Sequence, residues 1–153
     1  MIDKKKEFFM QKALMQANIA FKKGEVPVGA VVVDSDGKIL SRGYNKIEKD
    51  KCQLSHAEVV AIKKACKKKG DWRLDDCWIY VTLEPCLMCL GLMKLSRLKG
   101  VIYGAKSPLF GLGCKLDELP VFYNKGFEII GGIKKKESAN LLKHFFSIAR
   151  ERG

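Results

Sequence analysis

The stretch "CWIYVTLEPCLMCLGLMKLSRL", residues 77–98, joins an apolar run to a helical pattern through a pair of cysteines. Residues 77–83 are apolar and rich in β-branched and aromatic side chains, which predicts a buried strand. Pro85 suits a helix start, because the first turn of a helix offers no intrahelical partner for the N–H that proline lacks. Residues 86–98 then predict a helix, so Cys86 and Cys89 lie at its beginning, directly after the strand.

Helix and strand patterns continue on both sides of this stretch. Residues 4–23 carry apolar side chains at helical spacing, which predicts a helix that ends before Gly24. The runs "VPVGAVVV" and "KILSRGYN" flank the turn sequence Asp34–Gly37 and predict an antiparallel hairpin. The remaining pattern predicts helices over 57–70 and 136–150, strands over 100–105 and 126–133, and a loop over 106–120. Because strands alternate with helices after the hairpin, we expect a mixed sheet with helices on both faces.

The composition is that of an ordinary globular domain. The 153 residues are 47% hydrophobic and 30% charged, so we expect one domain over 1–153 with a full core. No apolar run approaches the ~20 residues that a membrane span needs. The start of the chain lacks the pattern of a secretory signal peptide, so we expect a cytoplasmic protein. In that reducing compartment six cysteines are more often thiols, ligands or nucleophiles than disulfides.

The chain is strongly basic. It has 29 Lys and Arg against 17 Asp and Glu, a formal net charge of +12. The basic residues form short runs at 4–6, 67–69 and 134–136, and each run by itself is typical of a solvated face. Taken together, the basic runs and the net charge indicate a polyanionic partner. Nucleic acid is the first candidate for this partner and an acidic membrane surface is the second.

The cysteine pair allows three interpretations. A redox Cys-x-x-Cys needs a thioredoxin-like order of elements, which the predicted elements lack. A structural zinc site needs four protein ligands, and the other cysteines are placed singly, at Cys52, Cys66, Cys77 and Cys114. The third interpretation is two buried apolar thiols. A helix N-terminus, however, also stabilises the thiolates that bind metal, so the pair alone leaves metal and core open.

The segment "SHAEVV", residues 55–60, supplies the other parts of a metal site. His56 is one of two histidines and stands at a predicted helix start, with Glu58 two residues later. Catalytic zinc sites use three protein ligands and leave the fourth position for water, and His56, Cys86 and Cys89 make such a set. Glu58 could carry protons beside that water. By itself, a glutamate there could equally favour the positive end of a helix.

Together these motifs resemble a known family. The segments "GEVPVGAVVV", "GYNK", "HAE", "TLEPCLMC" and "VIYGA" follow the order and nearly the spacing of the bacterial tRNA-specific adenosine deaminases, in the cytidine deaminase-like superfamily. The resemblance runs from about residue 10 to residue 150, and the joint pattern His-x-Glu … Pro-Cys-x-x-Cys is typical of zinc nucleobase deaminases. It implies a three-layer α/β/α fold around a mixed five-stranded sheet, one Zn²⁺ per chain and a homodimer. The implied reaction is hydrolysis of adenosine to inosine at the wobble position of a tRNA anticodon stem-loop.

The resemblance also assigns individual residues. His56, Cys86 and Cys89 match the family's zinc ligands, and Glu58 matches its proton carrier. Five further residues match positions at or near the bound base, namely Val28 in the pocket wall, Asn45 as the base-recognising residue, Leu83 and Glu84 where backbone groups shape the site, and Phe146 in the last helix. By periodicity alone Val28 and Phe146 would be core residues, with Phe146 on one stripe with Leu142, Phe145 and Ala149. Asn45 alone would be a turn residue.

Several segments depart from the family pattern: "DKCQLSHAE" before the histidine, "KSPLFGLGC" after "VIYGA", and Asn124 followed by Lys125. Cys52 precedes His56 by four residues, but a fourth protein ligand would displace the water, so we expect that Cys52 does not bind the zinc.

Two other functions are possible alternatives. A deaminase of a free base or nucleoside such as guanine or cytosine uses the same zinc core but has no need of a charge of +12. A non-catalytic, zinc-stabilised RNA-binding module has no use for Glu58.

Overall fold

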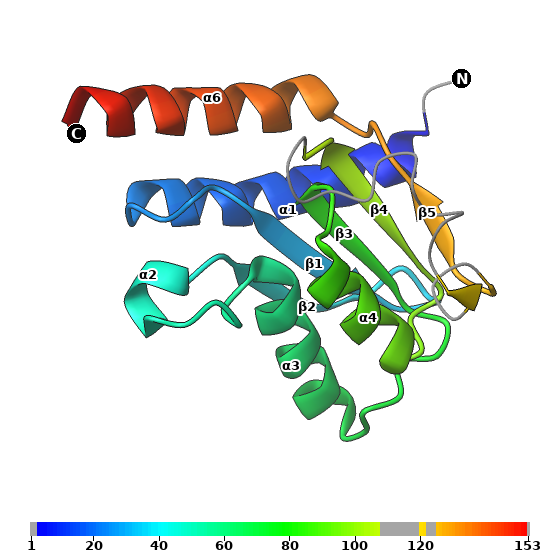
Figure 1. The fold of residues 1–153 in the computed structure, drawn as a ribbon. Helices are drawn as coiled ribbons and strands as arrows, with labels where there is room; N and C mark the ends of the chain where they lie inside the picture. Colours follow the sequence, from blue (N-terminus) through cyan, green and yellow to red (C-terminus); the bar gives the residue numbers. More distant parts are fainter. Residues whose placement is uncertain (1–2, 108–119, 122–124, 153) are drawn as a thin grey trace.

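The computed structural model describes residues 3–107, 120–121 and 125–152 (Figure 1). Its centre is a five-stranded sheet in the order β2-β1-β3-β4-β5. The first strand β1 pairs antiparallel with both β2 and β3, whereas β3, β4 and β5 are parallel. The strands are β1 (Gly29–Val33), β2 (Ile39–Tyr44), β3 (Trp78–Leu83), β4 (Gly100–Ala105) and β5 (Glu128–Ile130). The predicted mixed sheet of five strands is therefore confirmed.

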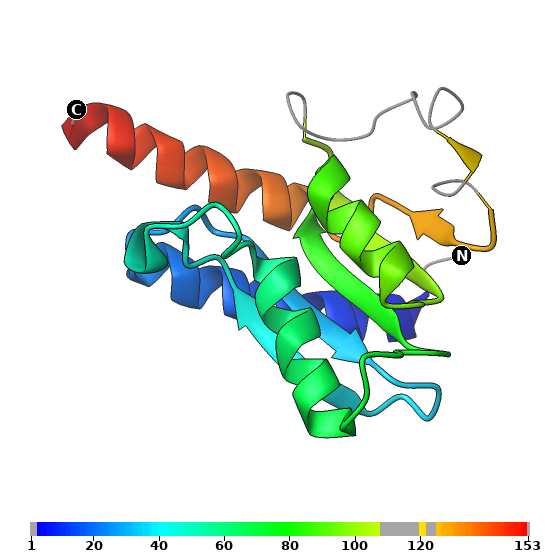
Figure 2. The same cartoon turned by 60° about the horizontal axis from the view of Figure 1, so that its bottom comes forward.

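Helices cover both faces of this sheet (Figures 1 and 2). The helices are α1 (Lys4–Lys22), α2 (Ile47–Asp50), α3 (Ala57–Lys69), α4 (Leu87–Leu95) and α6 (Lys135–Arg152). One face carries α1 and α6, and the other carries α3 and α4, which confirms the three-layer fold. Within the residues that the structure describes, every helix is too short or too polar to span a bilayer.

Two hydrophobic cores lie on the two faces, and alternate residues of β1 supply both. Ala30 and Val32 belong to the core beneath α3 and α4, whereas Val31 and Val33 belong to the core beneath α1. All four side chains are buried. This is the two-residue period of a strand that is covered on both faces, and it explains why the run is apolar without interruption.

Asp34 closes the hairpin between β1 and β2. Its carboxylate accepts hydrogen bonds from the backbone N–H groups of Asp36 and Lys38, both at 2.9 Å. Gly37 has a φ of +79°, a left-handed conformation that glycine adopts without a steric penalty. The predicted Asp-Gly turn is confirmed.

Close contact between α3 and β2 fixes the place where the candidate site begins. A Cβ on Gly43 of β2 would lie 2.7 Å from the carbonyl oxygen of Ala57 and 2.7 Å from the amide nitrogen of Ala61. Real Cβ atoms do not approach other atoms within 3.0 Å, so only glycine fits between the two backbones. The first turn of α3 is therefore held against the sheet, directly after His56.

Two helices differ from the prediction. The four-residue helix α2 was not predicted, because four residues are too few to show a hydrophobic period. The helix α4 ends at Leu95 rather than at residue 98. Arg97 has a φ of +63°, which no right-handed helix can contain, so the chain turns toward β4 earlier than the apolar pattern suggested.

The C-terminal elements also differ in extent. The last strand β5 spans only three residues of the predicted 126–133, and α6 is longer than predicted. Phe146 is 46% exposed, so its interpretation as a core residue was wrong, whereas Val28 is buried as expected. Phe21 of α1 meets α6 instead at His144, with stacked rings 5.3 Å apart, and at Phe145, with ring centroids 6.0 Å apart. Most of the predicted loop 106–120 lies outside the described residues.

The two edges of the sheet are β2 and β5. At the β2 edge, the side chain of Lys64 reaches from α3 and donates a hydrogen bond to the carbonyl oxygen of Arg42 at 3.2 Å. At the other edge, β5 is short and begins with the exposed residue Glu128.

Candidate metal and catalytic site

The three predicted ligands come from the N-termini of α3 and α4. His56 is the N-cap residue of α3, Cys86 is the N-cap residue of α4, and Cys89 lies in the first turn of α4. The two helices lie side by side on one face of the sheet (Figures 1 and 2). The positive ends of both helices therefore meet where the thiols are, and this favours the thiolate form.

The distances between the three side chains fit a zinc ion. Nδ1 of His56 lies 3.4 Å from Sγ of Cys89 and 3.7 Å from Sγ of Cys86. The three ligand atoms all lie within 4.8 Å of one another. Tetrahedral zinc with ordinary Zn–N and Zn–S bonds places a nitrogen and a sulfur ligand roughly 3.6 Å apart. The set contains three ligands, as in zinc sites that leave one position for a reactant.

Glu58 lies in the first turn of α3 and is 4% exposed. Burial raises the pKa of its carboxyl group, and the nearby His56 acts in the opposite direction. A hydrogen bond between this carboxyl group and the Cys89 thiol also lowers the pKa of Glu58, so the carboxyl group lies beside the ligand set. The predicted combination of three ligands and one carboxylate is thus brought together at one point.

The two cysteines of the pair are not equivalent. A hydrogen bond from the Cys89 thiol lowers the pKa of Cys86 to about 4, and a hydrogen bond with His56 acts in the same direction. The same contact with Cys86 raises the pKa of Cys89, which is fully buried. The pKa of His56 is raised, mainly by its hydrogen bond to Cys86. Of the two thiols, Cys86 therefore ionises more readily, as expected for the more exposed residue at the helix end.

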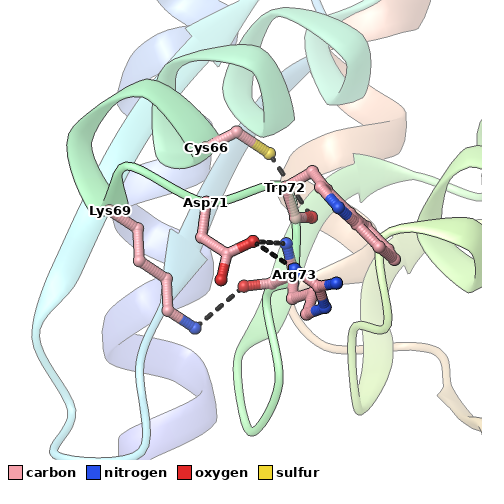
Figure 3. A network of polar contacts seen from close by, with 5 residues as sticks. All are labelled: Cys66, Lys69, Asp71, Trp72 and Arg73. Carbon is pink, nitrogen blue, oxygen red and sulfur yellow. Dashed lines mark hydrogen bonds and ion pairs between the residues drawn. The ribbon is translucent and has the colours of Figure 1, made fainter.

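The other described cysteines lie away from this site. Cys52 is exposed and is not part of the ligand cluster found among the described residues, as expected. Cys66 is near the far end of α3, where its thiol donates a hydrogen bond to the carbonyl oxygen of Trp72 at 3.7 Å (Figure 3). Asp71 and Arg73 form an ion pair at 3.1 Å in the same turn. Cys77 is buried below the helices, and Cys114 lies outside the described residues.

Comparison with known proteins places this site in a family. The family model of the cytidine and deoxycytidylate deaminase zinc-binding region matches residues 3–105, which include His56, Glu58, Cys86 and Cys89. The tRNA-specific adenosine deaminase of Rickettsia bellii (strain RML369-C) is 45% identical over 147 residues, or 93% of this chain and 100% of that protein. The chain belongs to the tRNA-specific adenosine deaminases. It is thus a zinc-dependent hydrolytic deaminase, as the motifs predicted.

Two solved structures bear on this family assignment. One comes from a study of A-to-I editing by tRNA:A34 deaminases at the wobble position of transfer RNA. It is 34% identical, with a TM-score of 0.78 over 88% of this chain and 99% of that one. The other, a guanine deaminase from Bacillus subtilis, is 42% identical with a TM-score of 0.62, over only 65% of this chain and 64% of that one. The similarity to the structure from the tRNA:A34 deaminase study therefore covers more of this chain than the similarity to the Bacillus subtilis guanine deaminase does.

In this deaminase Asn45 is buried beside the end of β2. Its side-chain amide donates a hydrogen bond to the carbonyl oxygen of Val26 at 3.2 Å, and its Oδ1 accepts one from the N–H of Ile47 at 3.3 Å. Its backbone N–H donates to the carbonyl oxygen of Val28 at 3.1 Å. The interpretation of Asn45 as a turn residue is therefore correct. The backbone contact places Asn45 next to Val28, the predicted wall of the base pocket.

The remaining predicted residues, Leu83, Glu84 and Phe146, lie in different parts of the fold. Leu83 ends β3 and packs half-buried against the core beneath α3 and α4. Glu84 follows it, and its N–H donates to the carbonyl oxygen of Ala105 at 2.8 Å. Its carboxylate accepts a hydrogen bond from the N–H of Ser107 at 3.0 Å, a side-chain role that was not predicted. Phe146 lies on α6, across the sheet from α3 and α4, with its ring 5.4 Å from that of Phe145 (Figure 1).

Sequence analysis missed one polar residue in this region. Glu25 is 3% exposed, and its carboxylate accepts hydrogen bonds from the backbone N–H groups of Glu48 and Lys49. The only signal in the sequence is an acidic residue directly before the apolar run Val26–Val28. Isolated acidic residues are almost always exposed, so this signal did not distinguish Glu25 from a surface residue.

Proposed function

We propose that this deaminase converts adenosine to inosine at the wobble position of a tRNA anticodon. The observation that supports the chemistry is the cluster of His56, Cys86 and Cys89 at two helix starts, with the carboxylate of Glu58 buried beside it. The family assignment supports the substrate. We place the reaction in a single domain over residues 1–153 and in the cytoplasm.

In the proposed mechanism His56, Cys86 and Cys89 would hold one zinc ion. When bound, zinc lowers the pKa of a coordinated water so that hydroxide forms near neutral pH. Glu58 accepts the proton that the attacking water gives up. It transfers this proton to the purine ring nitrogen, and then carries the second proton of the same water to the amino group, which leaves as ammonia while the new carbonyl forms. A buried carboxylate suits this task, because no bulk water competes for the proton.

We assign the base pocket to residues around the ligands. The side chain of Asn45, held by Val26 and Ile47, would hydrogen-bond to the edge of the base. Val28 would form the apolar wall, and backbone groups at Leu83 and Glu84 would shape the side nearest the zinc. Phe146 is 46% exposed on α6 and would contact a nucleotide next to the target rather than the target itself. Exposed aromatic rings stack on single-stranded bases.

The basic surface supports an RNA substrate over a free base. A net charge of +12 has no use in binding a neutral base, whereas an anticodon stem carries closely spaced phosphates. The wobble base sits in a single-stranded loop, so turning it into a pocket costs little unstacking energy. Deamination of guanine or cytosine remains the alternative, because the zinc core of such enzymes is the same.

The substrate test compares RNA with free bases. We expect an anticodon stem-loop with adenosine at the wobble position to yield inosine and ammonia, and guanine, cytosine and cytidine to react poorly. RNA affinity should fall steeply between low and moderate salt, by about tenfold or more if several phosphates are contacted. The matched control is the same stem-loop with guanosine at the wobble position. Fast ammonia release from guanine or cytosine, with none from the stem-loop, would transfer the assignment to the free-base alternative.

We also propose a homodimer, formed through the end of α4 that carries the ligands. Leu87 and Met88 are 46% and 42% exposed there, beside Cys86 and Cys89. Adjacent exposed apolar side chains favour burial against another protein surface. We expect light scattering at micromolar concentration to give about twice the 17.2 kDa mass of the chain. The mutation Leu87→Glu should produce monomers, whereas Leu95→Glu, at the opposite end of the same helix, should not. A wild-type monomer with full activity would contradict the proposal.

A further inference from the structure

The first N–H groups of the short helix α2 donate hydrogen bonds to the side chains of residues that precede it in the chain. Oε1 of Glu25 accepts from the N–H of Glu48, and Oε2 accepts from the N–H of Lys49, both at 2.9 Å. Oδ1 of Asn45 accepts from the N–H of Ile47 at 3.3 Å. The first three N–H groups of the helix are therefore all satisfied by side chains outside it.

These contacts matter more for α2 than for a longer helix. The first N–H groups of any helix depend on outside acceptors, and four residues leave almost no internal hydrogen bonds. The N-cap residue Lys46 makes no side-chain bond to the helix. Glu25 is buried, so its carboxylate must replace lost hydration with hydrogen bonds, and both of its oxygens do so. Bonds to an ionised carboxylate are stronger than neutral ones, so Glu25 is the main anchor of α2.

The segment that Glu25 anchors connects two parts of the site. It begins at Asn45, whose N–H donates to the carbonyl oxygen of Val28, and it leads into His56. The N–H of Lys46 donates to the carbonyl oxygen of Ser55 at 2.9 Å, which closes residues 46–55 into a loop. Movement of α2 would break the bond between Ile47 and Asn45 and leave the Asn45 side chain held only by its bond to the carbonyl oxygen of Val26, so its orientation would be less restricted.

We propose that Glu25 is a positioning residue for the substrate base and acts through α2 and Asn45. It touches neither the base nor the zinc ligands, and its effect is to hold the Asn45 amide in the orientation that the base requires. This inference rests on the proposed function, in which Asn45 recognises the base. A recognition group that is already held in its binding orientation loses little further conformational entropy when the substrate binds. Release of α2 should therefore weaken substrate binding more than it slows the chemical step.

The test measures stem-loop deamination kinetics for Glu25→Ala. We expect the KM to rise by about tenfold, the size of effect that a poorly held hydrogen-bonding group produces. The kcat should stay within about threefold of wild type and the zinc content should be unchanged, because the ligands and Glu58 are untouched. The variant Glu25→Gln keeps one acceptor oxygen and should give an intermediate KM. If Glu25→Ala folds poorly, the same measurement can still be made on Glu25→Gln.

Asp34→Ala is the matched control, because Asp34 also accepts two backbone N–H groups but does so in the hairpin turn. It should lower the melting temperature without raising the KM. Hydrogen exchange gives a readout independent of activity: amides in residues 45–55 should exchange faster in Glu25→Ala, and those in residues 34–38 should not. If wild type fails to deaminate the stem-loop, the proposed function is wrong, and the exchange data still decide whether Glu25 holds the segment. Three results would overturn the inference. They are a KM of Glu25→Ala equal to that of wild type, the same rise in KM for Glu25→Ala and Asp34→Ala, or unchanged hydrogen exchange at residues 45–55 in Glu25→Ala.

Discussion

Glu58→Gln is expected to reduce stem-loop deamination by about 10²–10⁴-fold, the usual contribution of a proton carrier in a transition state. The substitution keeps the shape of a side chain that is only 4% exposed, so the fold should tolerate it. Glutamine cannot accept the proton of the attacking water or deliver it to the base. Zinc content should stay near one per chain and RNA affinity should stay near that of wild type, because Glu58 is not in the ligand set.

The control for this variant is Glu48→Gln, an exposed glutamate whose backbone rather than side chain takes part in the contacts around the site. It should retain wild-type turnover. Zinc content and RNA affinity, measured on the same preparations, separate a lost proton carrier from a lost fold. Turnover of Glu58→Gln within tenfold of wild type would show that another group moves the proton.

Cys89→Ala is expected to lose most of the bound zinc and to unfold more easily. Bound metal stabilises the folded state by mass action, by about 4 kcal/mol when free zinc is 1,000 times its Kd. Cys86→Ala should behave in the same way, because each thiol supplies one of three ligand atoms. Elemental analysis measures the zinc, and chemical denaturation with and without added zinc measures the change in the free energy of unfolding.

Two other cysteines serve as matched controls for this experiment. Cys77 is buried like Cys89 but lies outside the ligand cluster, so Cys77→Ala removes a packed thiol and should keep the zinc. Cys52→Ser should change neither zinc nor stability, because Cys52 is exposed. Full zinc retention in both Cys86→Ala and Cys89→Ala would exclude this ligand set.

The parts of the fold that the sequence predicted correctly are those with a repeating physical cause. The hairpin follows from β-branched runs around Asp34–Gly37, and α3 follows from apolar spacing that ends at Gly70. The cluster of His56, Cys86 and Cys89 was predicted because metal chemistry restricts both the residue types and their spacing. In these places the types of residue and their spacing in the sequence carry the signal.

The parts that were not predicted depend on partners far away in the sequence. The helix α2 is held by Glu25, which precedes it by more than 20 residues, so its own four residues contain no pattern. The stripe through Phe146 shows which side of α6 is apolar, but not how much of it a neighbour covers. Asn45 illustrates a third case, because its turn contacts follow from its residue type, whereas its proposed contact with a base rests on the resemblance to the family.

The two edges of the sheet have a consequence for how copies of this chain can meet. An open strand edge pairs readily with another chain and leads to aggregation, unless it is short, charged or covered. Here the side chain of Lys64 donates a hydrogen bond to the carbonyl oxygen of Arg42 on β2. The strand β5 has only three residues and begins with the charged Glu128. A foreign strand would have to displace a lysine at one side and could gain few hydrogen bonds at the other. Continuous sheets across molecules are therefore disfavoured, and the protein can be concentrated while specific association is left to its helices.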